Sequence, residues 1–182
     1  MRSKLPYLLA LLCAVLLVAC SPEDSTTNSE ETTNEFVFNS VTYNLVTAIV
    51  TDENTTTNDP SEIGISLFNK SSSEITSNGD LDNVSYVYFD FDDVTIQNRT
   101  YNQIDDYDIS INGSIVDSEF NPGTILLSDN DSESDVYAQS GLVTVTNFTQ
   151  YNIAFTFTFT RNDGQVISGS YNGNYLLPGN ND

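Results

Sequence analysis

Apolar and polar residues alternate along several stretches of the chain, most clearly towards its C-terminal end. Between residues 151 and 160 nearly every second position is apolar, and the positions between them are mostly Asn and Thr. Successive side chains of a strand point to opposite faces, so this period of two predicts a strand buried on one side. The side chains expected to face the core are Tyr151, Ile153, Phe155, Phe157 and Phe159.

Two longer segments are apolar on both faces, as expected of central strands. Val41–Thr51 alternates at first and then becomes apolar throughout, and Val84–Phe91 is apolar on both faces until Asp90. Turn dipeptides such as Asn78-Gly79 separate the candidate strands. Shorter strands are predicted at Ile63–Phe68, Tyr107–Asn112, Gly123–Leu127, Val136–Gln139 and Leu142–Asn147.

The number and spacing of these strands predict the fold class. No stretch shows clear helical periodicity, and about nine or ten short strands separated by turns indicate an antiparallel arrangement. We therefore expect an all-β protein, with a single antiparallel β-sandwich or flattened β-barrel over residues 35–178. Residues 179–182 are expected to form a disordered tail.

The last predicted strand alternates glycine with aromatic residues. One face carries Ile167, Gly169, Tyr171, Gly173 and Tyr175, and the other carries only Ser and Asn. Glycine weakens a strand, so its repetition here indicates close approach of a neighbouring ring or backbone, or sharp coiling of the sheet. We interpret this strand as the closure of the fold, with both tyrosines packed inward. The alternative is a row of tyrosines that faces a ligand.

The first residues have the pattern of an export signal. Arg2 and Lys4 precede an apolar run from Leu5 to Ala19, and Cys20 follows it. This run has 15 residues, whereas a membrane-spanning helix needs about 20. We therefore expect residues 1–19 to be a signal peptide, with a transmembrane helix as the competing interpretation.

The four residues Leu17-Val18-Ala19-Cys20 resemble the lipobox of bacterial lipoproteins. The resemblance implies that Cys20 carries diacylglycerol and, after cleavage, an acyl chain such as palmitate on its amine. Two or more chains hold a protein firmly at a membrane. Ser21 after the cysteine favours the outer membrane in that family. Residues 20–34, rich in Ser, Thr and acidic residues, are expected to include the lipidated cysteine and a flexible acidic tether.

Three segments resemble small Bacteroidota surface lipoproteins, whose functions are mostly uncharacterised. They are the opening strands at Phe36–Leu45, the Gly-x-Val-x-Val run at Gly141–Val145 and the aromatic and Gly/Tyr strands at Tyr151–Tyr175. Glu23 and Asp24 also resemble the acidic signal that exports such lipoproteins to the cell exterior. Asp24-Ser25-Thr26 resembles the O-glycosylation site of that phylum, with Ser25 as the acceptor. Together these implied features predict a protein anchored in the outer membrane and facing the exterior.

The composition of the chain excludes several kinds of catalytic, metal-binding and nucleic-acid-binding site. The chain has no histidine, and its two cysteines are Cys13, within the signal, and Cys20. Histidine-based nucleophile activation and metal sites built on imidazole or thiolate are therefore excluded. All 26 acidic residues follow Cys20, whereas only Lys70, Arg99 and Arg161 of the five basic residues do. Such a charge repels phosphate backbones, so we expect no nucleic-acid partner and membrane contact only through the lipid.

An acidic loop is the best candidate for a metal site. Carboxylates at alternate positions can wrap Ca²⁺, which takes six to eight oxygen ligands. The loop departs from an EF-hand, because Ser134 stands at its sixth position and Ser140 at its twelfth. A soluble hairpin tip has the same composition, and Asp105, Asp106 and Asp108 form a poorer candidate. The calcium candidates, the only cofactor considered, are Asp129, Asp131, Glu133 and Asp135.

Two further groups of residues have weaker functional interpretations. Asp90 and Asp92, with Asp93 beside them, offer carboxylates for glycoside hydrolysis, but their spacing places them on one strand rather than across a substrate. Tyr86 and Tyr88, with Tyr43, are candidates for a pocket, although buried strand aromatics usually form the core.

The leading functional hypothesis is a surface-displayed, non-catalytic β-domain. Its role would be to bind a glycan or a protein partner, or to contribute to the cell envelope, for example in a calcium-dependent surface layer. The alternatives are a small-ligand carrier with a barrel cavity and, less favoured, a carboxylate-dependent glycan-processing enzyme. The sequence names no catalytic residue and predicts no enzymatic activity.

Overall fold

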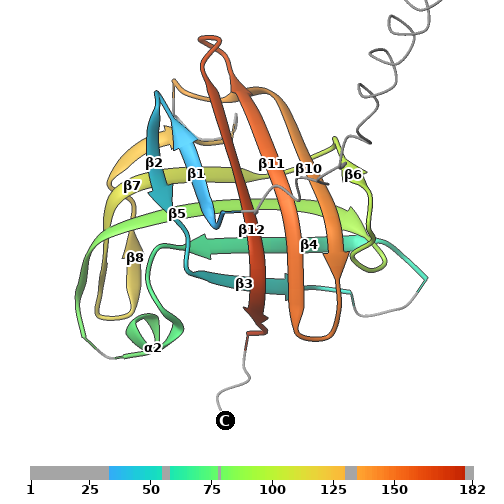
Figure 1. Cartoon of the computed structure of the whole chain (residues 1–182), viewed down its shortest axis with the longest axis horizontal. Helices are drawn as coiled ribbons and strands as arrows, with labels where there is room; N and C mark the ends of the chain where they lie inside the picture. Colours follow the sequence, from blue (N-terminus) through green and yellow to red (C-terminus); the bar gives the residue numbers. More distant parts are fainter. Residues whose placement is uncertain (1–32, 55–57, 78, 130–134, 179–182) are drawn as a thin grey trace, which may run out of the picture. The chain divides into compact units, whose positions relative to one another are not determined.

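The computed structural model describes residues 33–54, 58–77, 79–129 and 135–178, and it confirms an all-β fold (Figure 1). The only helix in these residues is the four-residue α2 (Ser72–Ile75), which begins with a capping box between Ser71 and Glu74. The strands are β1 (Glu35–Phe38), β2 (Val41–Asn44), β3 (Thr47–Asp52), β4 (Ser61–Phe68), β5 (Leu81–Asp93), β6 (Thr100–Tyr101), β7 (Tyr107–Val116), β8 (Glu119–Asn121), β9 (Thr124–Leu127), β10 (Ala138–Phe148), β11 (Asn152–Arg161) and β12 (Val166–Leu176).

The twelve strands exceed the expected nine or ten for local reasons. The segment predicted as one strand over Val41–Thr51 divides into β2 and β3, whereas Val136–Gln139 and Leu142–Asn147 join into β10. The short strands β6 and β8 carry too few residues to show a period of two. Within the described residues, no helix is long and apolar enough to span a membrane.

The strands form one sheet that folds over itself into two layers. The first layer contains β10, β11 and β12, with β1 paired to β12 and β2 paired to β1, and the second contains β3, β4, β5 and β7. In Figure 1 the strands of the first layer run across those of the second, as in orthogonal sandwiches. Strand β12 joins the layers, because Tyr175 and Leu176 pair in parallel with Ala48 and Ile49 of β3, while the other pairings among the described strands are antiparallel.

Aromatic rings fill the space between the layers. The ring of Phe89 on β5 lies among the rings of three phenylalanines of β11, with centroid distances of 5.6 Å to Phe155, 5.8 Å to Phe157 and 6.3 Å to Phe159. All four side chains are buried, as the alternating pattern predicts. Tyr151 departs from that pattern and is 69% exposed, because it precedes the first residue of β11 and lies in the turn.

Gly169 of β12 and Gly141 of β10 lie against two of these rings. Gly169 pairs with Phe157, and a Cβ atom on Gly169 would lie only 2.4 Å from the ring and 2.7 Å from the carbonyl oxygen of Glu35. Gly141 pairs with Phe159 in the same way, with a corresponding distance of 2.7 Å. The close approach expected of the Gly/Tyr strand is therefore present, and Tyr171 is buried as predicted.

Candidate functional site

The candidate residues from the sequence are only partly within the described residues. Cys20 and Ser25 lie outside them, as do Asp131 and Glu133 of the acidic loop. The flanking Asp129 is half-buried and Asp135 is exposed. Among the residues that the structure describes, no three acidic side chains are arranged to hold a metal ion.

The fold brings Asp129 close to the other acidic run. Burial raises the pKa of Asp106 and of Asp108, and the negative charge of Asp129 raises both further. Asp90 joins this group, because its carboxylate accepts a hydrogen bond from the backbone N–H of Asp106 at 2.7 Å and one from the hydroxyl of Tyr88 at 3.0 Å. Residues from three separate candidates in the sequence thus form one acidic cluster, which we define as Asp90, Asp106, Asp108 and Asp129.

This cluster predicts that mild acid stabilises the domain. Burial raises the pKa of Asp90, Asp106 and Asp108, so above the ordinary value of about 3.9 the folded state binds protons that the unfolded state does not. The free energy of unfolding should therefore rise as the pH falls from 7 towards about 4. Hydrogen bonds to Ser71 lower the pKa of Glu74, which opposes this effect, but Glu74 is exposed whereas the raised pKa values belong to three carboxyl groups that are buried or half-buried.

Thermal unfolding at pH 7 and pH 5 checks this expectation. The melting temperature should be higher at pH 5 than at pH 7. Asp90→Asn should reduce this difference, because the amide keeps the shape of the carboxylate but does not titrate. Asp82→Asn, at an exposed position of the same strand, is the matched control. A melting temperature that falls between pH 7 and pH 5 would contradict the argument.

The three aspartates at the end of β5 have different surroundings. Asp90 is buried in the acidic cluster, Asp92 is exposed, and Asp93 is buried beneath the loop that follows the strand. Asp90 and Asp92 therefore lie in different environments, although both belong to β5. Of the tyrosines considered for a pocket, Tyr43 stacks on Phe36 at 4.8 Å against the core, while Tyr88 hydrogen-bonds Asp90.

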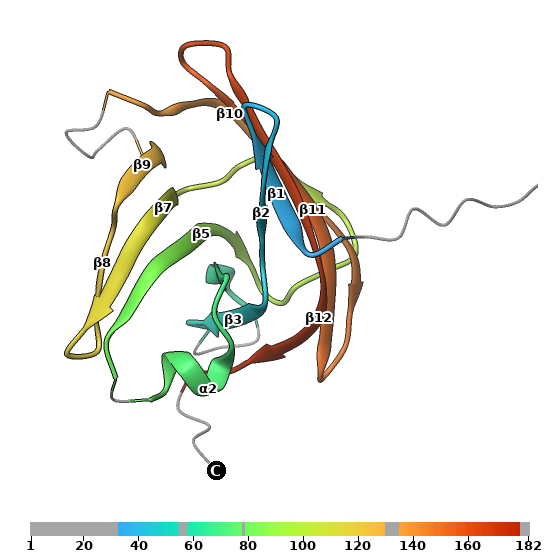
Figure 2. The same cartoon turned by 60° about the vertical axis from the view of Figure 1, so that its left-hand side comes forward.

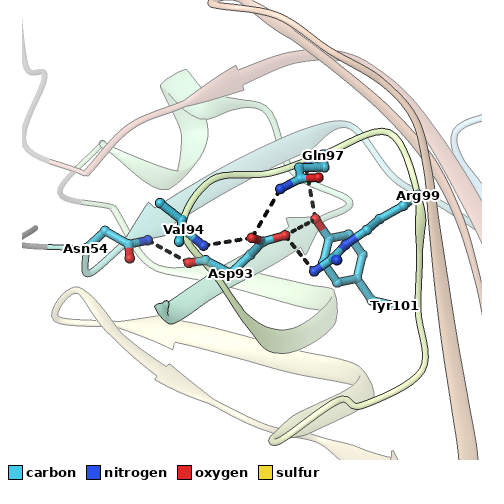
Figure 3. A network of polar contacts seen from close by, with 6 residues as sticks. All are labelled: Asn54, Asp93, Val94, Gln97, Arg99 and Tyr101. Carbon is cyan, nitrogen blue, oxygen red and sulfur yellow. Dashed lines mark hydrogen bonds and ion pairs between the residues drawn. The ribbon is translucent and has the colours of Figure 1, made fainter. Parts of the chain in front are cut away.

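Asp93 is the centre of a polar network (Figure 3). Its carboxylate accepts hydrogen bonds from the backbone N–H of Val94 at 2.7 Å, the hydroxyl of Tyr101 at 2.9 Å and the guanidinium of Arg99 at 2.7 Å. The side-chain amide of Gln97 donates a longer bond at 3.4 Å. Charge-assisted bonds of this kind are stronger than neutral ones, and together they fix the loop between β5 and β6.

The same network places Arg99 in a layered arrangement. The ring of Phe91 stacks on the ring of Tyr101 with a centroid distance of 3.8 Å. The guanidinium of Arg99 lies over the Tyr101 ring, 4.6 Å from its centroid. Tyr101 also accepts a hydrogen bond from the backbone N–H of Gln97 at 2.9 Å. The guanidinium is thus held by an ion pair and a cation–π contact, yet the side chain remains 50% exposed.

Arg99 faces a polar cleft of about 520 Å³ at this end of the domain. Planar polar groups converge there, and each of them can donate or accept hydrogen bonds. We call this the Arg99 cleft; it is lined by Asp92, Arg99, Thr100, Tyr101, Asn102, Gln103 and Asp105.

Sequence reasoning did not select Arg99, Asn102 or Gln103. The only available signal was Arg99 as one of three basic residues after Cys20. Comparisons of the chain with models of protein families, with curated proteins and with solved structures found no match.

Proposed function

We propose that this chain is a lipid-anchored, surface-displayed, non-catalytic β-domain that binds a neutral glycan in the Arg99 cleft. The observation that carries the proposal is the half-exposed guanidinium of Arg99, which the buried Asp93 holds in place. It lies in a cleft that also carries two amides, two hydroxyl groups and two carboxylates. A binding site needs such groups already held in place, because ordering them at the moment of binding costs free energy.

The chemistry of the cleft matches vicinal hydroxyl groups. The guanidinium of Arg99 and the amides of Asn102 and Gln103 supply donors, while Asp92 and Asp105 supply acceptors. A sugar hydroxyl is both donor and acceptor, so two neighbouring hydroxyls can bridge an amide or guanidinium and a carboxylate. Because the chain carries 26 acidic residues against five basic ones, an anionic polysaccharide would be repelled and a neutral one is favoured.

The anchor completes the proposal. The lipobox resemblance at Cys20 supports attachment through diacylglycerol and an acyl chain. Of the expected tether, Thr33 and Asn34 are hydrogen-bonded to the domain, so the residues before them would reach at most about 40 Å at 3.5 Å per residue. Display on the outer membrane, facing the exterior, would present the cleft to polysaccharides around the cell.

The filled core favours this function over a small-ligand carrier. A carrier needs an interior that its own side chains leave empty, whereas Phe89 and the phenylalanines of β11 occupy the space between the layers.

A glycan-processing enzyme is the second candidate, because Asp92 and Asp105 both line the cleft. Glycoside hydrolysis requires two carboxyl groups that flank the scissile bond. Release of reducing sugar from a bound glycan, abolished by Asp105→Asn, would establish the enzyme and contradict a non-catalytic role.

Isothermal titration calorimetry with neutral oligosaccharides of glucose, galactose, mannose and xylose tests the proposed sugar binding in the Arg99 cleft. We expect a sugar to bind, and Arg99→Ala to weaken its affinity about tenfold or more, because hydrogen bonds to a charged group contribute about 1.5–3 kcal/mol. Lys70→Ala removes the same charge outside the cleft and should leave the affinity unchanged. Equal affinities of the two variants would show that the cleft is not the site.

A further inference from the structure

A second pocket lies on the outer face of β5 and β7 and shares no lining residue with the Arg99 cleft. Strands β8 and β9 lie beside β7 (Figure 2). They contribute Phe120, Ile125 and Leu127 to the pocket. Its volume is about 270 Å³, near the lower end of the range for small-molecule sites. It is lined by Tyr86, Asp108, Ile109, Ser110, Phe120, Pro122, Ile125 and Leu127.

Two irregularities in strand pairing meet at this pocket. The register of β5 against β7 shifts between Val84 and Tyr86, and the register of β7 against β9 shifts between Ile109 and Ser110. Bulges of this kind re-aim side chains and are frequent beside functional sites. Here Tyr86 and Ser110 are register partners on the face opposite the core residue Ile109.

Ser110 contributes a buried polar atom that the protein leaves without a partner. The residue is only 3% exposed, and its Oγ makes no hydrogen bond. An unsatisfied buried hydroxyl costs free energy, so natural structures rarely keep one without a reason. A ligand in the pocket that offers a hydrogen bond would satisfy it.

Aromatic faces line one side of the pocket and are held firmly. The ring of Tyr86 lies 4.7 Å from Phe120 and 5.0 Å from Phe68, and its hydroxyl is 3.3 Å from Oγ of Ser66. Such ring faces attract cations as well as apolar groups.

The charge at the pocket is negative. Asp108 lines it, Asp106 and Asp129 lie close enough to interact with Asp108 electrostatically, and no Lys or Arg is among its lining residues. An anionic ligand would be repelled here, whereas a cation would gain the attraction of several carboxylates.

We propose that this pocket binds a small organic ammonium compound with an apolar body. The ammonium group lies at Asp108 and donates a hydrogen bond to Oγ of Ser110, while the apolar body packs against Tyr86, Phe120 and Ile125. This site is independent of the proposed glycan function, because the two sites have no residue in common.

Titration of the full-length chain with 2-phenylethylamine tests the proposal, and 2-phenylethanol serves as the uncharged probe of matched shape. We expect the amine to bind about tenfold more tightly than the alcohol, and this difference to vanish in Asp108→Asn. Ser110→Ala should lower the affinity for the amine several-fold. Asp92→Asn, which removes a charge from the Arg99 cleft instead, should leave the affinity for the amine unchanged.

Ile125→Trp gives a second check at an exposed position of the rim, where a larger side chain should block both probes without affecting the melting temperature. If Asp108→Asn fails to fold, the ratio of amine to alcohol affinity in the unaltered chain still shows whether the pocket favours an ammonium group. Equal binding of amine and alcohol, no binding of either, or amine binding that survives Ile125→Trp would overturn the proposal. None of these results bears on sugar binding in the Arg99 cleft, which the Arg99→Ala experiment decides separately.

Discussion

Replacing Phe89 by alanine should destabilise the domain by about 3–5 kcal/mol. Phe89 is fully buried on β5 and contacts three phenylalanine rings of β11, so it links the two layers of the sheet. Its removal forfeits the transfer free energy of the ring and leaves a cavity that the neighbouring rings fill only in part. For a single domain this is a large fraction of a total stability of about 5–15 kcal/mol.

Urea unfolding of residues 33–178 measures this effect through the shift of the midpoint at constant slope. Tyr151→Ala is the matched control, because Tyr151 belongs to the same alternating pattern but is exposed. Its effect should stay within about 0.5 kcal/mol, as for other surface positions. Similar losses in the two variants would mean that the rings of β11 do not form the centre of the core.

The second large effect is expected for Asp93→Ala, at about 3 kcal/mol. The substitution leaves the backbone N–H of Val94 and the hydroxyl of Tyr101 without their acceptor, and unsatisfied buried groups cost about 1–3 kcal/mol each. Arg99 loses its ion pair as well, but half of its side chain is exposed, so water compensates for most of that loss.

Urea unfolding of Asp93→Ala, Asp93→Asn and Asp92→Asn separates these contributions. Asp93→Asn keeps an acceptor for Val94 but turns an amide towards Arg99. Its loss of stability should therefore be smaller than that of Asp93→Ala and larger than that of Asp92→Asn. Asp92→Asn alters the exposed neighbour and should change stability by less than about 0.5 kcal/mol. If Asp93→Ala were as stable as Asp92→Asn, the network would not hold the loop.

The fold was largely predictable because strand periodicity is a local signal. Phe155, Phe157 and Phe159 show their buried face in the sequence alone, and the glycines of β12 indicate the close approach that Gly169 makes to Phe157. Tyr151 shows the limit, since periodicity does not fix the residue at which a strand begins.

The two sites were much less predictable, because they depend on contacts between distant segments. Arg99 carries no motif, and its role emerges only when Asp93 and Tyr101 hold it at the cleft. Tyr86 was a candidate pocket residue and Asp108 a weak metal candidate in the sequence, but nothing there joined them or selected Ser110. Pairing irregularities that no sequence pattern marks bring these three residues to one pocket. The acidic loop drew attention through composition, yet half of its candidate ligands lie outside the described residues.

The most direct test of the central claim is chemical-shift mapping of ¹⁵N-labelled residues 33–178 during titration with the neutral oligosaccharides. If the cleft binds sugar, shifts should concentrate on the side-chain signals of Arg99, Asn102 and Gln103 and on the backbone of the loop between β5 and β6, with signals of the Tyr86 pocket unchanged. Shifts that leave these three side chains unmoved, or the absence of any response across the sugars, would contradict glycan binding in the Arg99 cleft.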